Sequence, residues 1–293
     1  MVAIAFVGLG RMGHGMAARL VAAGHDVVLS NRTKGKASAL LAAGARSADS
    51  PREAADGVDV VVVMVSDDEA SRSVWQGSGG VLAGRPAPGA LAIECSTLSQ
   101  GWVLELAKSV QDKGMRYLDA PVTGLPSAAE AGELTLLLGG EPEVVEAAEP
   151  LLAAVSTARL HFGPVGAGTA YKLIVNLMGA VQIAGVAEGL AMAERAGLDL
   201  DQVLAAIASG QAASPQVVRT GRQMVAGSHA SEVVFPGRLR RKDADYGVRL
   251  AAALGVGAPL GRAALAGLDA LVAADLGDVN ESAVIEVARR AVP

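Results

Sequence analysis

Short apolar runs alternate with longer helical patterns through the first half of the chain. The apolar runs predict strands at residues 2–7, 26–29, 58–65, 90–95, 116–119, 134–138 and 159–162. Residues 58–65 are nearly all valine, which is typical of a central parallel strand that is buried on both faces. Helical patterns separate the strands, for example at residues 16–21, 102–111 and 141–154. This alternation predicts an α/β fold with a doubly wound, Rossmann-type sheet.

The pattern changes at the glycine-rich residues 163–168, after which the sequence has no further strand signals. Residues 169–196 predict one long helix, and the remainder predicts shorter helices interrupted by Pro215, Pro236 and Pro259. We therefore expect a dinucleotide-binding domain at residues 1–163 and an all-α domain at residues 164–293. The long helix is apolar on many faces, so we expect a buried spine or a subunit interface, in a homodimer or homotetramer.

A glycine-rich turn joins the first predicted strand to the first predicted helix. Its residues are Gly8, Leu9, Gly10, Arg11, Met12 and Gly13. The first glycine permits the turn, the second lets the backbone approach a pyrophosphate, and the third lets the helix pack on the strand. A helix that begins at such a turn directs its N–H groups towards the phosphates. The alternative is a connection that binds nothing, but the strand–turn–helix context favours a dinucleotide site.

The end of the second predicted strand indicates which dinucleotide binds. NAD-binding folds place an acidic residue there to bind the ribose 2′-hydroxyl. This chain has Asn31, Arg32 and Thr33 instead, followed by the basic Lys34. Donors and positive charge suit a 2′-phosphate, which a carboxylate would repel. We expect NADP(H) to be preferred and NAD(H) to remain possible; the alternative is an ordinary polar turn.

Composition and charge exclude several other classes of protein. The 293 residues are 51% hydrophobic, 19% charged and 3% aromatic, with a net charge of −5, which argues against a nucleic-acid partner. The single cysteine, Cys95, cannot form an intrachain disulfide, and the four scattered histidines have no ligand spacing, so no metal site is expected. We expect neither a signal peptide nor a membrane span. These features fit a cytoplasmic protein.

Three further segments carry a family resemblance. They are the run Asp119, Ala120, Pro121, Val122, Thr123 and Gly124; the glycine-rich turn that leads to Lys172 and Asn176; and the run Arg241, Lys242 and Asp243. In this order and spacing they resemble the β-hydroxyacid dehydrogenases, which include 3-hydroxyisobutyrate dehydrogenase, tartronate semialdehyde reductase and glyoxylate/succinic semialdehyde reductases. The resemblance covers essentially the whole chain. It implies a Rossmann-type domain, an all-α domain and a cleft between them.

Reduction of a carbonyl needs a hydride from nicotinamide and a proton donor beside the oxygen. A lysine that faces a cleft from an apolar helix has a lowered pKa, which suits it to acid–base chemistry. By resemblance, Lys172 is the catalytic lysine, and Asn176, one helical turn later, binds the substrate and orients the lysine. From helix spacing alone, a lysine that extends into solvent would be the simpler interpretation.

The resemblance also assigns the remaining contacts. Thr123, Gly124 and Leu125 follow a predicted strand and would bind the substrate carboxylate through a hydroxyl and backbone N–H groups; a plain loop is the alternative. Most relatives have Ser-Gly-Gly here, so Leu125 is a departure from the family pattern. Val175 is another, because relatives often have a polar residue there. These two departures leave the identity of the substrate undecided. Cofactor contacts are expected from Val65, Ser66, Thr97 and Lys242, with Gln100 in place of the usual proline. From composition alone, residues 238–243 would be a solvated helix start.

The sequence therefore predicts an NADPH-preferring oxidoreductase that interconverts a small β- or ω-hydroxy acid and its semialdehyde. The expected partner is a small carboxylate-bearing aldehyde or hydroxy acid, whose identity stays open. An imine reductase of the same fold is the first alternative, but those relatives usually replace the lysine with Asp or Tyr. A non-catalytic NADPH-binding module is the second, and the presence of Lys172 and Asn176 argues against it.

Overall fold

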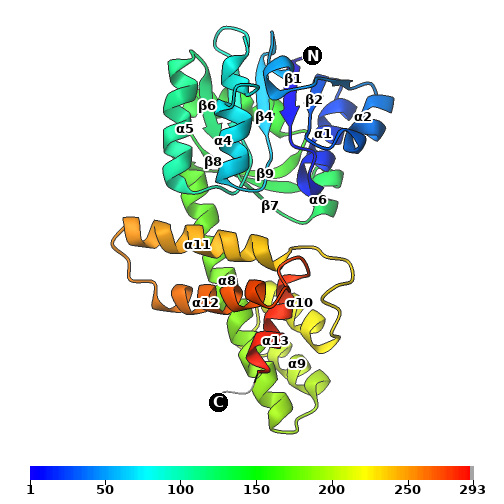
Figure 1. The fold of residues 1–293 in the computed structure, drawn as a ribbon, viewed down its shortest axis with the longest axis vertical. Helices are drawn as coiled ribbons and strands as arrows, with labels where there is room; N and C mark the ends of the chain where they lie inside the picture. Colours follow the sequence, from blue (N-terminus) through cyan, green and yellow to red (C-terminus); the bar gives the residue numbers. More distant parts are fainter. Residues whose placement is uncertain (291–293) are drawn as a thin grey trace. The chain divides into compact units, whose positions relative to one another are not determined.

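The computed structural model describes residues 1–290 (Figure 1). Its elements are, in order, β1 (Ala3–Val7), α1 (Arg11–Ala22), β2 (Asp26–Ser30), η1 (Lys34–Ala37), α2 (Ser38–Ala42), β3 (Arg46–Ser47), α3 (Pro51–Ala54), β4 (Val60–Val63), α4 (Asp68–Gln76), η2 (Val81–Ala83), β5 (Leu91–Glu94), α5 (Gln100–Asp112), β6 (Arg116–Asp119), β7 (Val122–Thr123), α6 (Pro126–Ala131), β8 (Leu134–Gly139), α7 (Pro142–Leu152), β9 (Ser156–Gly163), α8 (Ala167–Arg195), α9 (Leu200–Ser209), α10 (Pro215–Val225), α11 (Gly237–Ala253), α12 (Pro259–Ala273), η3 (Glu281–Ala283) and α13 (Val284–Ala288).

The sheet has the order β3-β2-β1-β4-β5-β6-β8-β7, and β9 pairs with β8. From β3 to β6 every neighbouring pair is parallel, so the carboxyl ends of these strands share one edge. This part of the sheet confirms the predicted Rossmann-type architecture. In a doubly wound sheet, ligands bind at the carboxyl edge, which is therefore where a site is expected.

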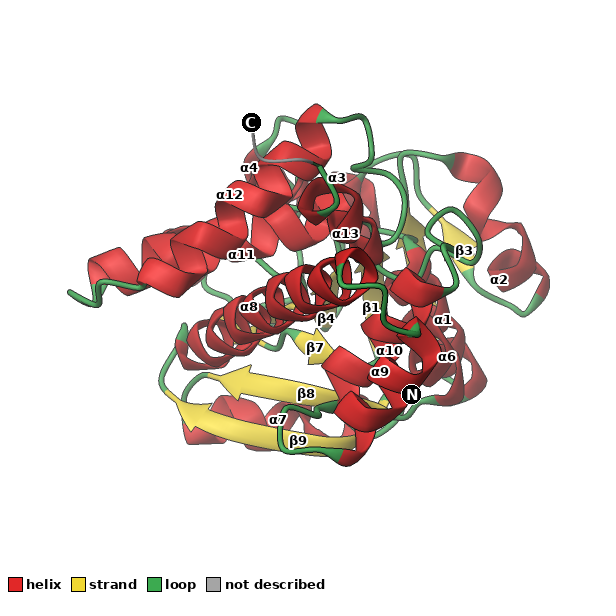
Figure 2. Cartoon of the chain, turned by 90° about the horizontal axis from the view of Figure 1, so that it is seen from below, coloured by secondary structure: helices red, strands yellow, loops and turns green. Residues whose placement is uncertain are grey.

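The parallel series of strands is interrupted at β8, a reversal that the alternation of strands and helices in the sequence did not indicate. Strand β8 runs antiparallel to β6 and β7 and parallel to β9 (Figure 2). A parallel crossover needs about a dozen or more residues, and residues 124–133 between β7 and β8 are too few. The chain therefore turns back through the short helix α6, which lies beside α1 (Figures 1 and 2).

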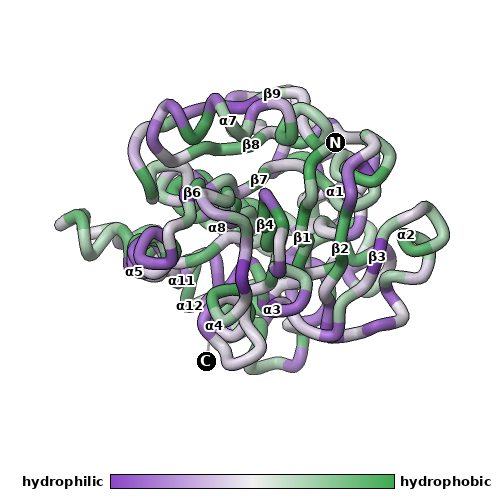
Figure 3. The backbone as a smooth tube through the Cα atoms, turned by 90° about the horizontal axis from the view of Figure 1, so that it is seen from above, coloured by the Kyte–Doolittle hydropathy of each residue, from purple (hydrophilic) through white to green (hydrophobic). Residues whose placement is uncertain are grey.

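Apolar layers cover both faces of the sheet. Val60 and Val62 of β4 pack in one layer with residues of α1 and α7, whereas Val61 and Val63 pack in the other with Trp75 and residues of α5. All four valines are buried, as predicted for a central strand with two covered faces. The residues of β1 and β8 are likewise mostly hydrophobic (Figure 3).

The chain divides into two compact units, Met1–Lys172 and a second that begins at Leu173. The division falls within α8, whereas the predicted domain boundary at residue 163 precedes this helix. The second unit is helical, as expected, and α11 lies beside α12 (Figure 1). Its core includes Ala180, Ile183, Val186 and Leu190 from α8.

Helix α8 is long and apolar enough to cross a membrane by length and composition alone. The expectation of no membrane span rested on the lack of a long uninterrupted apolar run, and α8 reaches its high mean hydropathy with isolated polar residues inside it. A core helix passes the same test, and several residues of α8 are buried in the core of the second unit.

Candidate functional site

The glycine turn between β1 and α1 has the backbone geometry that a phosphate site needs. Gly8 has a φ of +101°, and a Cβ there would lie 2.2 Å from the carbonyl oxygen of Met64. A Cβ on Gly13 would lie 2.0 Å from the carbonyl oxygen of Gly8, whereas Gly10 has open space around it. No side chain caps α1, and its first turn has no acidic residue. The N-terminal N–H groups of this helix therefore fit the phosphates of a dinucleotide.

Asn31 connects the end of β2 to the glycine turn. Its Oδ1 accepts a hydrogen bond from the N–H of Leu9 (2.9 Å), and its Nδ2 donates one to the carbonyl of Thr33 (2.7 Å). Arg32 is exposed beside it. The ammonium group of Lys34 lies 2.7 Å from Asp49 on the surface. Of these two basic residues, Lys34 is held in a surface ion pair, and Arg32 is exposed at the end of β2.

The ends of β4 and β5 are connected through a buried carboxyl group. The N–H of Val65 donates to the Oγ of Ser96 (2.8 Å), and the N–H of Ser96 donates to Glu94 (3.0 Å). Glu94 is fully buried and also accepts from Ser71 (2.9 Å) and Trp75 (2.8 Å). Burial raises the pKa of Glu94. These bonds fix the segments that contain the predicted cofactor contacts Val65, Ser66 and Thr97.

Asp119, at the end of β6, binds the start of α8. Its Oδ1 accepts from the N–H of Gly166 (2.7 Å), and its Oδ2 accepts from the N–H (2.7 Å) and the Oγ1 (2.9 Å) of Thr169. Burial raises the pKa of Asp119 to about 6, although these donors act in the opposite direction. Sequence reasoning included Asp119 in a motif but assigned it no role.

The segment predicted to bind the substrate carboxylate is not a plain loop. Thr123 belongs to strand β7 and pairs with Thr135 of β8. Gly124 has a φ of +138°, and a Cβ there would lie 2.9 Å from the side chain of Leu134. Thr123 and Leu125 are exposed where the chain leaves β7 for α6. The pairing of β7 could not be inferred from a strand of two residues.

Lys172 lies in the second turn of α8, and Asn176 follows one turn later on the same helix. In the second unit, the Nδ2 of Asn176 donates to the Oδ2 of Asp243 (2.7 Å). The Nζ of Lys242 lies 3.1 Å from the Oδ1 of the same carboxylate, which is 2% exposed. Asp243 therefore orients two predicted site residues, a role that sequence reasoning did not assign to it.

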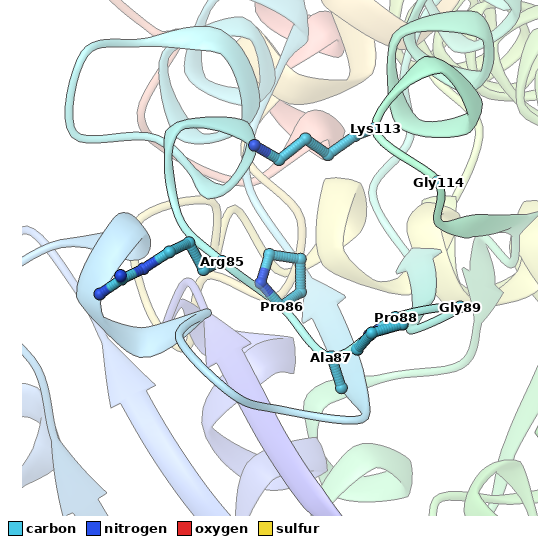
Figure 4. Close-up of a pocket in the computed structure, with 7 residues that line it drawn as sticks. All are labelled: Arg85, Pro86, Ala87, Pro88, Gly89, Lys113 and Gly114. Carbon is cyan, nitrogen blue, oxygen red and sulfur yellow. The ribbon is translucent and has the colours of Figure 1, made fainter.

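A surface pocket of about 390 Å³ lies elsewhere, at residues that precede β5 and β6 (Figure 4). Its lining residues are Arg85, Pro86, Ala87, Pro88, Gly89, Lys113 and Gly114. This is the amino edge of the parallel strands, opposite the predicted site. Within residues 1–290, no group of three or more His, Cys, Asp or Glu side chains could hold a metal ion.

Comparison with known proteins identifies the family of the chain. Residues 3–163 match the NAD binding domain of 6-phosphogluconate dehydrogenase, and residues 166–288 match the NAD-binding domain of NADP-dependent 3-hydroxyisobutyrate dehydrogenase. Arabidopsis thaliana glyoxylate/succinic semialdehyde reductase 1 is 32% identical over 290 residues, 98% of each protein. A structure of Mycobacterium tuberculosis 3-hydroxyisobutyrate dehydrogenase with L-serine superimposes with a TM-score of 0.88 at 33% identity, over 99% of this chain and 100% of that one.

The fold and the glycine turn are those of a dinucleotide-binding protein, and the family matches identify an oxidoreductase that uses a nicotinamide cofactor. The chain belongs to the β-hydroxyacid dehydrogenase family, as its motifs indicated, and is an NAD(P)-dependent oxidoreductase. A Streptomyces aurantiacus imine reductase shares the fold more distantly, with a TM-score of 0.62 and 24% identity over 98% of this chain and 99% of that one.

The raised pKa of Asp119 predicts a pH dependence of stability. Because its folded-state pKa of about 6 exceeds the ordinary 3.8, the folded protein binds the proton more tightly than the unfolded chain. The free energy of unfolding should therefore fall as pH rises from about 4 to about 6, by at most about 3 kcal/mol, and then level off. Urea unfolding at pH values from 4 to 8 measures the free energy of unfolding. The parent protein should show this fall, and Asp119→Asn should not. Parallel curves for the two proteins would contradict it.

Proposed function

We propose that this chain is an NADPH-preferring oxidoreductase that interconverts a small β- or ω-hydroxy acid and its semialdehyde, with Lys172 as the proton donor in reduction. The observation that carries the proposal is the contact of Asp119 with the first turn of α8. This contact fixes the start of the lysine-bearing helix at the carboxyl edge, where the glycine turn also lies. A proton donor and a nucleotide-binding turn at one edge suit carbonyl reduction.

Each residue has a separate task in this proposal. The cofactor is bound by the turn of Gly8, Leu9, Gly10, Arg11, Met12 and Gly13, and by Asn31, Arg32, Thr33, Val65, Ser66, Thr97 and Lys242. When bound, the nicotinamide supplies or accepts the hydride. Lys172 donates a proton to the oxygen of the carbonyl, and Asn176 and Thr123 orient the substrate. Gly124 and Leu125 lie beside the carboxylate of the substrate. The side chain of Leu125 makes this part of the site narrower than glycine would.

The substrate class is supported by the relatives, whose names include 3-hydroxyisobutyrate dehydrogenase and glyoxylate/succinic semialdehyde reductase. Oxidation of NADPH, followed by absorbance, tests it with glyoxylate and with succinic, tartronate and methylmalonate semialdehydes; L-serine with NADP⁺ tests the reverse direction. Turnover of at least one carboxylate-bearing substrate is expected. Turnover of cyclic imines alone would favour the imine reductase alternative. Tight NADPH binding without any turnover would favour a non-catalytic module.

Replacement of Lys172 should remove the proton donor. For Lys172→Ala we expect kcat to fall roughly 10²–10⁴-fold, which is the usual contribution of a positioned general acid. The dissociation constant for NADPH should not change, because the proposed phosphate contacts lie on other elements. The control is Lys108→Ala, which removes an exposed lysine of α5. A Lys172→Met variant that retains near-parental turnover from pH 6 to 9 would exclude the lysine from the mechanism.

Preference for NADPH should depend on Arg32. Arg32→Ala should raise the KM for NADPH with little change for NADH, because a charge-assisted phosphate contact contributes about 1.5–3 kcal/mol. Steady-state kinetics with both cofactors measure this difference. Arg85→Ala, at the opposite edge of the sheet, is the matched loss of an exposed arginine. Equal use of NADPH and NADH by the parent protein would refute the preference.

We also infer a homodimer or homotetramer. Helix α8 has large apolar side chains that are exposed in the single chain, namely Ile174, Val175, Met178 and Met192. Exposed apolar surface of this kind is typical of a subunit interface. Sedimentation at micromolar concentration should give a mass at least twice 29.4 kDa. A monomer under these conditions would rule the interface out.

A cytoplasmic location is proposed from the single cysteine. Cys95 is buried, burial raises the pKa of its thiol, and it has no cysteine partner in the chain. A reducing compartment suits such a protein. Recovery of the protein in a secreted fraction would contradict this location.

A further inference from the structure

The contact between the Rossmann-type sheet and α8 is unusually close. We call it the α8 junction and define it by Asp119, Gly139, Gly166, Gly168 and Thr169. Gly139 pairs with Asp119 across β6 and β8, and a Cβ on Gly139 would lie 2.5 Å from the Asp119 Oδ1. A Cβ on Gly168 would lie 2.1 Å from the carbonyl oxygen of residue 137. The first turn of α8 therefore lies directly against the backbone of β8, and neither glycine leaves room for a side chain.

Within this junction, the carboxylate of Asp119, at the end of strand β6, caps the N-terminus of α8. It is 0% exposed, and both of its oxygens accept hydrogen bonds, from two backbone N–H groups and one hydroxyl. The N–H groups at a helix start have no partner within the helix, and a carboxylate there is favourable both as an acceptor and as a negative charge near the helix dipole. Its contacts fix both the axial position and the rotation of the first turn.

Lys172 follows Thr169 by three residues, so its backbone lies one helical turn beyond the capped residue. On the other side, Asp119 ends the strand that leads into Pro121 and then into Thr123 of β7. One carboxylate thus connects the segment that bears Thr123 with the helix that bears Lys172.

We propose that Asp119 is a positioning residue for the reaction: through the α8 junction it sets where Lys172 stands relative to the bound substrate. The inference rests on the proposed function, in which Lys172 is the proton donor. A general acid must lie within hydrogen-bond reach of the oxygen that it protonates, and a misplacement of about 1 Å can lower the rate about 10²-fold. Asp119 itself touches neither substrate nor cofactor in this proposal.

A graded series of variants tests the inference. Asp119→Ala leaves three buried donors without an acceptor, and we expect kcat to fall about 10²-fold with an unchanged dissociation constant for NADPH. Asp119→Asn keeps one acceptor oxygen and should recover part of the loss. Thr169→Val removes only the hydroxyl contact and should have the smallest effect. If Asp119→Ala does not fold, Asp119→Asn and Thr169→Val still test the inference.

A double-mutant cycle separates positioning from a merely structural role. If Asp119 acts through Lys172, then adding Asp119→Asn to Lys172→Met should not lower the residual kcat further, so the two losses are not additive. The control is Asp199→Ala. Asp199 also accepts from two backbone N–H groups, of Asp201 and Gln202, at the start of α9. Its loss should lower stability and leave kcat unchanged.

The possible failures are distinguishable. If Lys172→Met retains turnover, the proposed role of Lys172 as the proton donor fails, and the inference fails with it. If Lys172→Met loses turnover while all three junction variants keep the parental kcat, only the inference is overturned. Additive losses in the cycle, or an equal fall of kcat in Asp199→Ala, would likewise overturn it. A graded fall of kcat that is absent from the Lys172→Met background supports it.

Discussion

The organisation of the site depends on one buried carboxylate, that of Asp119. The parallel sheet brings the ends of six neighbouring strands, β3 to β6 in the sheet order, to one edge, but the lysine-bearing helix begins after β9, beyond the antiparallel return of the chain. The contact of Asp119 with Gly166 and Thr169 joins the start of that helix to the end of β6. Burial of a carboxylate is costly, and three donors offset that cost.

The same physical device recurs at the other strand ends. Asn31 accepts from the glycine turn at the end of β2, and the pair of Glu94 and Ser96 fixes Val65 after β4. In each case a polar side chain that is largely shielded from water accepts from backbone that would otherwise be free to move. The exposed groups at this edge can then be rigid before any ligand arrives, which lowers the entropic cost of binding. Hydrogen-bond acceptors that need not contact a ligand therefore hold the backbone of the site in place.

A feature of the fold or of the site could be predicted from the sequence only where neighbouring residues carry its pattern. The glycine turn and the valine strand could be read directly, because turn residues and buried parallel strands leave contiguous patterns. Strand β7, helix α6 and the antiparallel return of β8 could not, since they are short and defined by pairing with distant residues. The roles of Asp119, Glu94 and Asp243 were missed for the same reason: each acts on a partner far along the chain.

The most direct test of the account is a structure of the protein with NADP⁺ and a hydroxy acid that it turns over. The account predicts that the Nζ of Lys172 lies within about 2.6–3.2 Å of the substrate hydroxyl oxygen, the range for a proton transfer partner. It also predicts that Asp119 keeps its contacts with the first turn of α8. A complex in which another side chain or a water contacts that hydroxyl, with Lys172 out of reach, would contradict the account.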